Sequence, residues 1–307
     1  MTSKTTPHYE KLLSALENEK LPDGDKPRLK QAIEKYHAWL TALDKAEELS
    51  SSGERLTKMV ELLNEYKLYI DLELIFDSDD DFLYRQKGQL KLDNSIVEEF
   101  LPRIISPSII PELEALKVAV GPTTTFSSVY FESSLDQPVS GGGISIRTKD
   151  QDFAISKKLY ITASHDADFR EAAMRETYVG YIVAEIKTNL DKTMFQEACA
   201  TAHDVKASVP GARYFLLCEW LDMTPVSTAQ TAIDEVLILR KAKRMNSNIR
   251  SQFGEAAKRK TRRGDYLNFL KEHPLSREMF ERFVGHVQLH TKNEAPQEGN
   301  VLDSGYF

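Results

Sequence analysis

Two charged residues stand at the end of an apolar segment of the chain. Residues 178–184 are uncharged and mostly apolar, and Glu185 and Lys187 follow them with Ile186 in between. If this segment is a β-strand, side chains two positions apart lie on the same face, so a carboxylate and an ammonium group project together. Burial of these charges is costly unless a metal ion or a counter-charge compensates for it. The pair therefore indicates either a metal-dependent catalytic site or a salt bridge at the edge of a sheet.

A metal site would need a further carboxylate, because hard divalent cations take oxygen ligands from several acidic side chains. Asp152 begins another strand-like segment, and an antiparallel return through residues 178–187 would bring Glu185 beside it. Asp168 is nearer to Glu185 along the chain, but residues 169–177 have the pattern of a helix or a loop. We therefore expect Asp152 to be the partner of Glu185, with Asp168 as the alternative.

The order of these elements resembles that of a known nuclease family. An aspartate, a strand with Glu-x-Lys and then a helix are the core of the PD-(D/E)xK nucleases, and the resemblance covers roughly residues 143–240. The family's usual proline before the aspartate is absent, because Gln151 stands there. More narrowly, residues 184–198 and 214–224 resemble type II restriction enzyme subunits of the BbvCI kind. The resemblance implies cleavage of double-stranded DNA at a specific sequence, by a homodimer or by a heterodimer with a related subunit.

The resemblance also implies a role for each residue of the site. Asp152, Glu185 and the main-chain carbonyl of Ile186 would hold one or two Mg²⁺ ions, which activate water and neutralise charge on the scissile phosphate. Lys187 would orient or deprotonate that water, or stabilise the phosphate as a point charge.

Other polar residues are candidates for supporting the site or for binding DNA. Gln196 and Glu197 lie in the helix expected after Lys187 and would stabilise the metal ligands, unless they simply face solvent. Residues 240–263 contain ten basic residues and only one acidic residue, Glu255, which suits backbone phosphates, although a solvated charged helix would have the same pattern. Asn246, Asn248 and Gln252 among them are candidates for reading base edges. The predicted DNA-binding residues are Arg240, Lys241, Lys243, Arg244, Asn246, Asn248, Arg250, Lys258, Arg259, Lys260, Arg262 and Arg263.

The hydrophobic pattern favours an α/β fold, in which helices flank a mixed β-sheet. Helical periodicity dominates the first third of the chain, where apolar residues recur every three or four positions. Strands are expected at residues 143–147, 152–162, 178–187, 213–222 and 234–240, with a helix over 189–209 between the third and the fourth.

Charge divides the chain in the same way. Residues 1–100 hold 14 Lys and Arg against 21 Asp and Glu, whereas residues 101–307 hold 26 of each. We expect three parts: an N-terminal helical region over 1–100 that clamps DNA or dimerises, a nuclease domain over 101–291, and a tail over 292–307.

Several other chemistries lack the residues that they require. The acidic segment from Asp77 to Asp81 lacks the glycine and the distal glutamate of a calcium-binding EF-hand. Cys199 and Cys218 fit two buried thiols better than a disulfide or a zinc site. The sequence has no apolar run of about 20 residues and no secretory signal pattern, so we expect a cytoplasmic protein. A DNA repair or recombination nuclease on the same core, and a non-catalytic DNA-binding protein whose Glu-x-Lys is a salt bridge, remain the alternatives.

Overall fold

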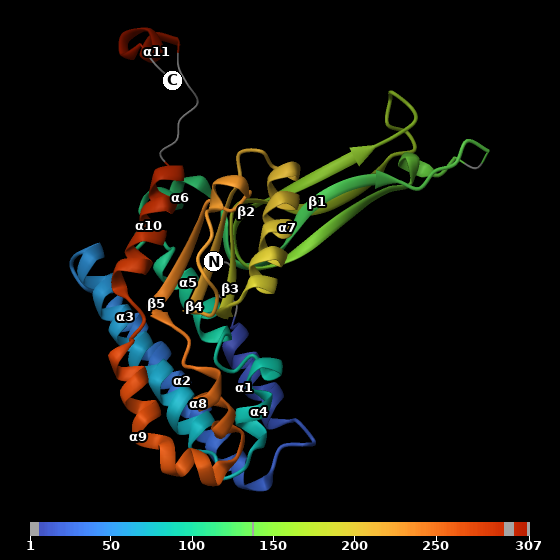
Figure 1. Cartoon of the computed structure of the whole chain (residues 1–307). Coiled ribbons are helices and arrows are strands. Elements are labelled where there is room, and N and C mark those ends of the chain that lie inside the picture. Colours follow the sequence, from blue (N-terminus) through green and yellow to red (C-terminus); the bar gives the residue numbers. More distant parts are fainter. Residues whose placement is uncertain (1–5, 137, 292–297, 306–307) are drawn as a thin grey trace.

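The chain folds around a five-stranded mixed sheet (Figure 1). The computed structural model describes residues 6–136, 138–291 and 298–305. The strands follow one another across the sheet in chain order: β1 (Ala119–Phe131), β2 (Ile144–Ala163), β3 (Ala173–Leu190), β4 (Arg213–Leu221) and β5 (Glu235–Lys243). The first three strands pair antiparallel and the last three pair parallel. The predicted α/β fold with a mixed sheet is thereby confirmed.

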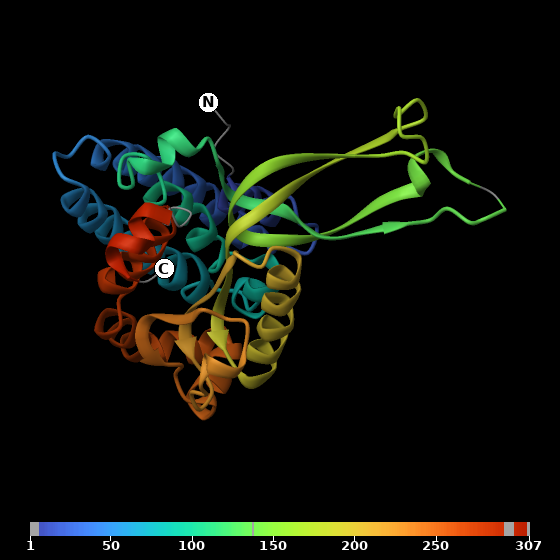
Figure 2. The same cartoon turned by 90° about the horizontal axis from the view of Figure 1, so that it is seen from above.

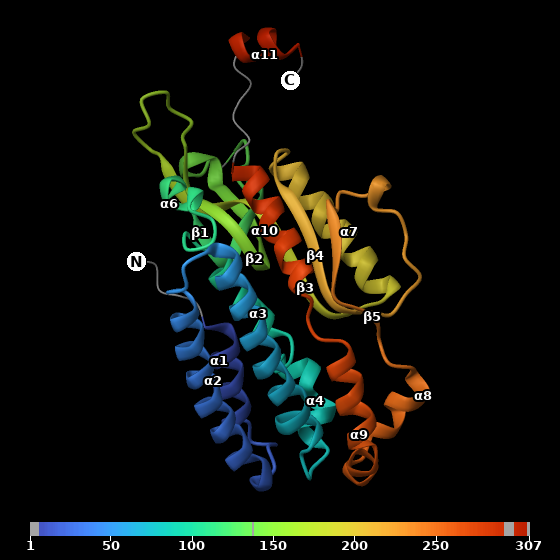
Figure 3. The ribbon, with the colours of Figure 1, turned by 90° about the vertical axis from the view of Figure 1, so that its left-hand side faces the viewer.

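One helix makes the crossover that the parallel pair β3 and β4 requires. α7 (Lys192–Ser208) starts at Asp191, whose side chain accepts a hydrogen bond from the backbone N–H of Met194 and so caps the helix. Its apolar side packs against one face of the sheet, where Val183 and Leu216 are buried. α10 (Arg277–Thr291) covers the opposite face (Figure 3). Because both faces are covered, the ends of β3 and β4 are held in place.

The N-terminal helices share a hydrophobic core with the sheet and with α10. Phe100 packs edge-on against Phe280 of α10 with ring centroids 5.3 Å apart, and Phe153 of β2 packs in the same way on Phe283 at 5.7 Å. This shared core fixes the helices next to the ends of β2 and β3. Their bounds are α1 (Pro7–Leu16), η1 (Asp23–Asp25), α2 (Lys26–Ala46), α3 (Ser52–Leu68), the π-helical η2 (Tyr69–Phe76), α4 (Phe82–Leu90), α5 (Ser95–Ile104) and α6 (Glu112–Leu116).

The remaining elements lie towards the C-terminus or in loops: η3 (Ser140–Gly143), η4 (Thr228–Gln230), α8 (Ser247–Arg250), η5 (Ser251–Gly254), α9 (Ala256–Glu272) and α11 (Glu298–Ser304). Of the tail expected over 292–307, residues 292–297 and 306–307 lie outside the described residues. Among the helices of the described part, none has the length and apolarity needed to cross a membrane.

Two hairpins project from the body as a long arm (Figures 1 and 2), which comprises residues 127–148 and 157–176. β2 pairs with β1 through its first part and with β3 through its second part, and both hairpin ends lie together at the far end of the arm. There the backbone N–H of Gly141 donates to the carbonyl of Glu171 at 3.2 Å. Gly141 has a φ of +61°, and a Cβ atom there would come within 2.5 Å of the Cβ of Ala173, so only glycine fits.

The arm has no hydrophobic core of its own. None of the three clusters of buried apolar residues found in the described chain includes a residue of the arm. Its five basic and six acidic residues nearly cancel. Its exposed large hydrophobic side chains are Val129, Tyr130, Phe131, Leu135, Val139, Leu159, Tyr160, Phe169 and Met174.

The structure adds one strand that was not predicted and corrects one prediction. Residues 119–131 form β1, a strand that the sequence did not indicate because Pro122, three threonines and two serines break up its apolar pattern. Residues 173–177, expected to be a helix or a loop, belong to β3. In both cases, pairing with β2 decides the conformation over local preference.

Candidate active site

β2 and β3 bring Asp152 to the part of β3 that carries Glu185. Their antiparallel register pairs Phe153 with Ala184, so Asp152 and Glu185 occupy the next position along the two strands. The backbone N–H of Ile186 donates a hydrogen bond to Oδ2 of Asp152 over 2.9 Å. A hydrogen bond to a charged acceptor is comparatively strong, so it orients the carboxylate. The two carboxylates that the sequence indicated as partners therefore lie side by side.

Glu185 is held through both of its carboxylate oxygens. Nζ of Lys187 lies 2.7 Å from Oε1, and the hydroxyl of Tyr214 donates to Oε2 over 2.6 Å. Tyr214 is buried on the neighbouring strand β4. Burial, together with the charge and the hydrogen bond of Glu185, raises the pKa of Tyr214, so its hydroxyl stays protonated and remains a donor. The sequence alone did not point to Tyr214.

Lys187 is a cation in this arrangement. Burial works to lower its pKa, but the hydrogen bond and charge of Glu185, with the charges of Asp152 and Glu197, outweigh burial and raise the pKa overall. The ammonium group therefore stays protonated at neutral pH. As a protonated group beside Glu185 it can stabilise a negative phosphate.

A second set of side chains reaches the site from the end of α4 and from α5. Lys91 lies 3.7 Å from Oδ1 of Asp152 and 3.6 Å from Oε1 of Glu98. The amide of Asn94 donates to the carbonyl of Ile186 at 3.1 Å and to Oε1 of Glu98 at 3.2 Å. Burial, and then the charge of Asp152, raise the pKa of Glu98. Lys91, Asn94 and Glu98 precede the segment that resembles the nuclease family. Nothing in their spacing in the sequence indicated a role at the site.

The donor atoms at this site suit a hard divalent cation. The described residues contain no group of three His, Cys, Asp or Glu side chains that would hold a metal by themselves. Asp152 and Glu185 supply two carboxylates, and the carbonyl of Ile186 accepts one hydrogen bond and keeps a second lone pair. The ammonium groups of Lys91 and Lys187 face these same carboxylates, so the site already attracts positive charge. The predicted ligand set of two side chains and one carbonyl fits a cation here.

Asp168, the alternative partner, lies elsewhere. It belongs to the connection between Ala163 and Ala173, at the far end of the arm, while Asp152 is at the base where Phe153 pairs with Ala184. Its side chain is 66% exposed and makes an ion pair with Arg170 at 2.7 Å. Asp168 is therefore not placed to share a ligand with Glu185.

The two helix residues predicted to support the site are both exposed on α7, and neither lines the pocket described next. Glu197 is close enough for its charge to raise the pKa of Lys187, after the larger effects of burial, Glu185 and Asp152. Gln196 is uncharged and makes no such contribution. Only Glu197 is thus electrostatically connected to the site.

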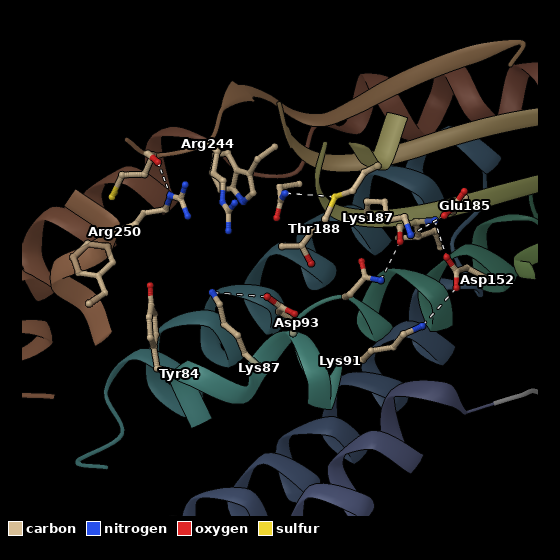
Figure 4. Close-up of a pocket in the computed structure, with 18 of the residues that line it drawn as sticks. Tyr84, Lys87, Lys91, Asp93, Asp152, Glu185, Lys187, Thr188, Arg244 and Arg250 are labelled. Atoms are coloured by element: carbon tan, nitrogen blue, oxygen red, sulfur yellow. Dashed lines mark hydrogen bonds and ion pairs between the residues drawn. The ribbon is translucent and has the colours of Figure 1, made fainter. Parts of the chain in front are cut away.

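The carboxylates line one end of a pocket of about 450 Å³ (Figure 4). Lys187 and Thr188 form one side near this end, and Lys91 approaches from the opposite side. The pocket then extends past Asp93 to a second end, where Arg244 and Arg250 face α4.

Two of the predicted DNA-binding arginines lie inside the protein, so this part of the prediction needs correction. Arg240 is 6% exposed and pairs with Glu219 at 2.9 Å and Asp71 at 3.2 Å. Arg259 is 1% exposed, and its guanidinium donates to the carbonyls of Phe76 and Asp80 at 2.8 and 2.7 Å. Both side chains are used by the fold and are unavailable to a phosphate. A count of charges along the chain cannot reveal this.

The basic residues of α9 face the acidic segment 77–81. Lys260 pairs with Asp79 at 2.7 Å, and Arg263 pairs with Asp77 at 2.8 Å. Three other basic residues of 240–263 also have acidic partners: Lys241 pairs with Glu278, Lys258 with Glu255 and Arg262 with Asp265. Much of the positive charge expected for DNA is therefore neutralised within the chain.

Part of the predicted basic surface stays available. Arg244 and Arg250 line the pocket, and Lys243, Asn246 and Asn248 are exposed. Across the pocket stand Lys87 and Lys91, which the sequence did not single out because they lie in the acidic first third. Together with Lys149 and Lys187, the cations at the pocket thus come from segments that are far apart in the chain.

The chain is similar to a protein family and to solved structures. A model of the Bpu10I restriction endonuclease family matches residues 89–307. No curated protein matches the sequence. A chain of the solved structure titled "native BbvCI A2B2 tetramer at low resolution" is 18% identical with a TM-score of 0.55, and the match covers 88% of this chain and 98% of that chain. At this identity the likeness is one of fold.

Proposed function

Because the chain belongs to the Bpu10I restriction endonuclease family, we propose that it is a type II enzyme that hydrolyses phosphodiester bonds in double-stranded DNA at a specific sequence. The observation that carries the proposal is the convergence of Asp152, Glu185 and Lys187 at one end of an open pocket. Two oriented carboxylates beside a protonated lysine are suited to hydrolysis of a phosphodiester. They require no covalent intermediate.

Each residue has a defined task in this proposal. Asp152, oriented by the N–H of Ile186, and Glu185, oriented by Tyr214, present oxygen ligands on the same side of the strand ends. Lys187 keeps its charge because the charge and hydrogen bond of Glu185 raise its pKa above the ordinary value. It is placed to stabilise the negative charge that develops on the phosphate.

Magnesium is the proposed cofactor. Restriction endonucleases generally use divalent metal ions, and Asp152, Glu185 and the carbonyl of Ile186 are the residues that would hold Mg²⁺ here. When bound, the ion supplies an activated water and neutralises charge on the scissile phosphate. Asn94 keeps the carbonyl of Ile186 in position through its 3.1 Å hydrogen bond.

Incubation of the purified protein with a plasmid and Mg²⁺ tests the proposal. Wild-type protein should produce discrete fragments, EDTA should abolish cleavage, and Glu185→Gln should be inactive. Glu61→Gln is a matched control, because Glu61 is exposed on α3 and pairs only with a surface lysine at 3.0 Å. Cleavage by Glu185→Gln at the wild-type rate would show that the assigned site is wrong. Cutting at many unrelated sequences would favour a repair nuclease, and metal-independent binding without cutting would favour a non-catalytic protein.

The enzyme is also proposed to act as an assembly of two or more subunits, either copies of this chain or this chain with a related subunit. A double-strand cut needs two active sites, and the chain offers one Asp152–Glu185–Lys187 site. The similar BbvCI chain comes from a structure titled an A2B2 tetramer. The arm, with its exposed apolar side chains and nearly balanced charge, is a surface suited to a protein contact. A chain that needs a related subunit should leave nicked rather than linear plasmid when it acts alone.

A further inference from the structure

The second end of the pocket lies between the N-terminal helices and the segment after β5. Tyr84 and Lys87 project from α4, and Arg244 and Arg250 face them from the other side (Figure 4). The two sides are tied together. The rings of Tyr84 and Phe253 lie 6.2 Å apart, and Arg85 of α4 donates to the carbonyl of Gly254 at 2.9 Å. These contacts hold the two sides of this end of the pocket together.

Positive charge exceeds negative charge at this end. Arg244 and Arg250 share a single carboxylate oxygen of Asp222, at 3.0 and 3.7 Å. Lys87 approaches Asp93 only to 3.9 Å, which is too long for a hydrogen bond. The three cations are also partly shielded from water, with side chains 28–29% exposed. Three cations around two carboxylates leave a surplus that an anion would neutralise.

A further observation agrees with this surplus of positive charge. Burial, and then the charge of Arg244, lower the pKa of Arg250. Asp93 is 3% exposed, its Oδ1 atom is buried with no hydrogen-bond partner among the described residues, and its Oδ2 atom lies 3.9 Å from Lys87, so this carboxylate is not hydrogen-bonded to the cation beside it. Nε of Arg250 donates to the carbonyl of Met245 at 2.8 Å, which fixes the base of the guanidinium and leaves its far end towards the pocket.

The position of Lys87 relates this end to the carboxylates. Lys87 lies four residues before Lys91, which approaches Asp152 to 3.7 Å. Four residues of helix advance by about 6 Å, so the two lysines are spaced along one path through the pocket. A DNA strand whose scissile phosphate lies at Asp152 and Glu185 would carry a neighbouring phosphate towards Lys87.

We propose that Lys87 on α4, with Arg244 and Arg250 opposite it, binds a backbone phosphate that flanks the scissile phosphate of the same DNA strand. This inference rests on the proposed function and makes it more specific. Of the two roles expected for the N-terminal helical region, it selects the DNA clamp and identifies α4 as the part that contacts DNA. The ligand is a phosphodiester of the backbone, so the contact does not depend on base sequence.

The salt dependence of DNA binding tests the proposal directly. Binding of a short fluorescent duplex of mixed sequence is measured by anisotropy in EDTA, where the proposed metal-dependent cleavage cannot proceed, over a series of KCl concentrations. Each phosphate contact contributes about 0.9 to the slope of log K against log salt. Lys87→Gln should therefore reduce the magnitude of the slope by about one and weaken binding about tenfold at low salt. Lys87→Arg should restore the slope.

Lys58→Gln is the matched control. Like Lys87, Lys58 is a lysine on an N-terminal helix with a carboxylate nearby, Glu61 at 3.0 Å, but it does not line the pocket. For Lys58→Gln, the slope of log K against log salt and the affinity for the duplex should equal those of the wild-type protein. An unchanged slope for Lys87→Gln would overturn the proposal, and so would weaker binding with the same slope, since that would indicate a base contact or altered folding. An unchanged thermal midpoint for Lys87→Gln checks the folding.

The outcome separates this inference from the proposed function. If Glu185→Gln loses cleavage but Lys87→Gln binds with the wild-type slope, only the flanking phosphate contact fails. If Lys87→Gln lowers the slope but the wild-type protein never cuts DNA, the nuclease proposal fails and the phosphate site remains. A wild-type protein that binds no duplex would overturn both.

Discussion

The backbone N–H of Ile186 donates to the carboxylate of Asp152 across 2.9 Å and joins the two strands at the candidate active site. This hydrogen bond crosses from β3 to β2 at the base of the arm, beside Glu185. It identifies which of two aspartates can act with Glu185, because Asp168 lies at the far end of the same pair of strands.

Asp152→Asn should therefore be severely impaired in cleavage. The amide keeps the size of the side chain but removes the charge that a cation needs, so we expect a loss of at least about 100-fold, or about 2.7 kcal/mol of transition-state stabilisation. Initial rates of plasmid cleavage at saturating Mg²⁺ measure this effect. Asp168→Asn is the matched control and should cut normally. The opposite pattern would reassign the metal ligand to Asp168.

Tyr214→Phe should weaken the metal site without removing a ligand. Its hydroxyl is the donor at 2.6 Å that orients Oε2 of Glu185, and loss of such an outer contact lowers metal affinity or activity by roughly 10- to 100-fold. The concentration of Mg²⁺ needed for half-maximal cleavage should rise. Tyr181→Phe, on β3 and 38% exposed, should change little. Equal Mg²⁺ dependence for both variants would argue against the orienting role of Tyr214.

Substitution of Lys187 distinguishes a charged group from a proton acceptor. Glu185, with Asp152 and Glu197, raises the pKa of Lys187 despite burial, so the group is charged below that raised pKa and loses its charge only above it. Lys187→Arg should then keep cleavage at least about tenfold above Lys187→Gln, because arginine stays charged throughout the accessible pH range. The ratio of the two rates should not change between about pH 6.5 and about pH 8.5. Equal inactivity of both variants would instead support a general base.

Arg240→Gln should act on stability rather than on DNA binding. Lys67, Asp71, Glu219 and Arg240 form a buried group of two positive and two negative charges, with contacts of 2.6 to 3.2 Å. Removal of one member leaves an unpaired buried charge, which costs about 3–5 kcal/mol. Lys241→Gln breaks only an exposed pair with Glu278 and should cost no more than about 1 kcal/mol. Urea unfolding measures both, and a wild-type midpoint for Arg240→Gln would contradict the burial of this group.

His8 should make the protein less stable in mild acid. Its ring is fully buried between Ser95 and Tyr66, each 2.9 Å from a ring nitrogen. Burial, and then the charge of Lys67, lower its pKa from 6.5 to about 3. Between these values the unfolded chain binds a proton that the folded protein does not, so this contribution to stability is present above pH 6.5 and is lost as the pH falls towards 3.

The size of this effect follows from a comparison with His8→Gln. Urea unfolding at about pH 7 and about pH 5.5 should show the wild-type protein losing about 1 kcal/mol more than the variant. The comparison removes contributions from other groups, which titrate in both proteins. Parallel losses would mean that His8 is protonated in the folded state.

The sequence alone was sufficient for the features that depend on local pattern. Strand periodicity fixes which side chains share a face, so Glu185 and Lys187 were expected to project together, and their ends lie 2.7 Å apart. Asp152 was found because an antiparallel return needs only two strand-like segments and a connection. The mixed sheet follows from the order of strands and from the length of the α7 crossover.

Only the tertiary structure decided which charged side chains are available to bind a phosphate. Arg240 and Arg259 count as positive charges in any window of the sequence, but Glu219, Asp71 and several carbonyls bury and neutralise them. Lys87 and Lys91 lie in an acidic region, but the core shared by the N-terminal helices and the sheet carries them to the pocket. Coulomb interactions depend on distance in space rather than on distance along the chain, so the electrostatics of the site could be determined only once the fold had brought these segments together.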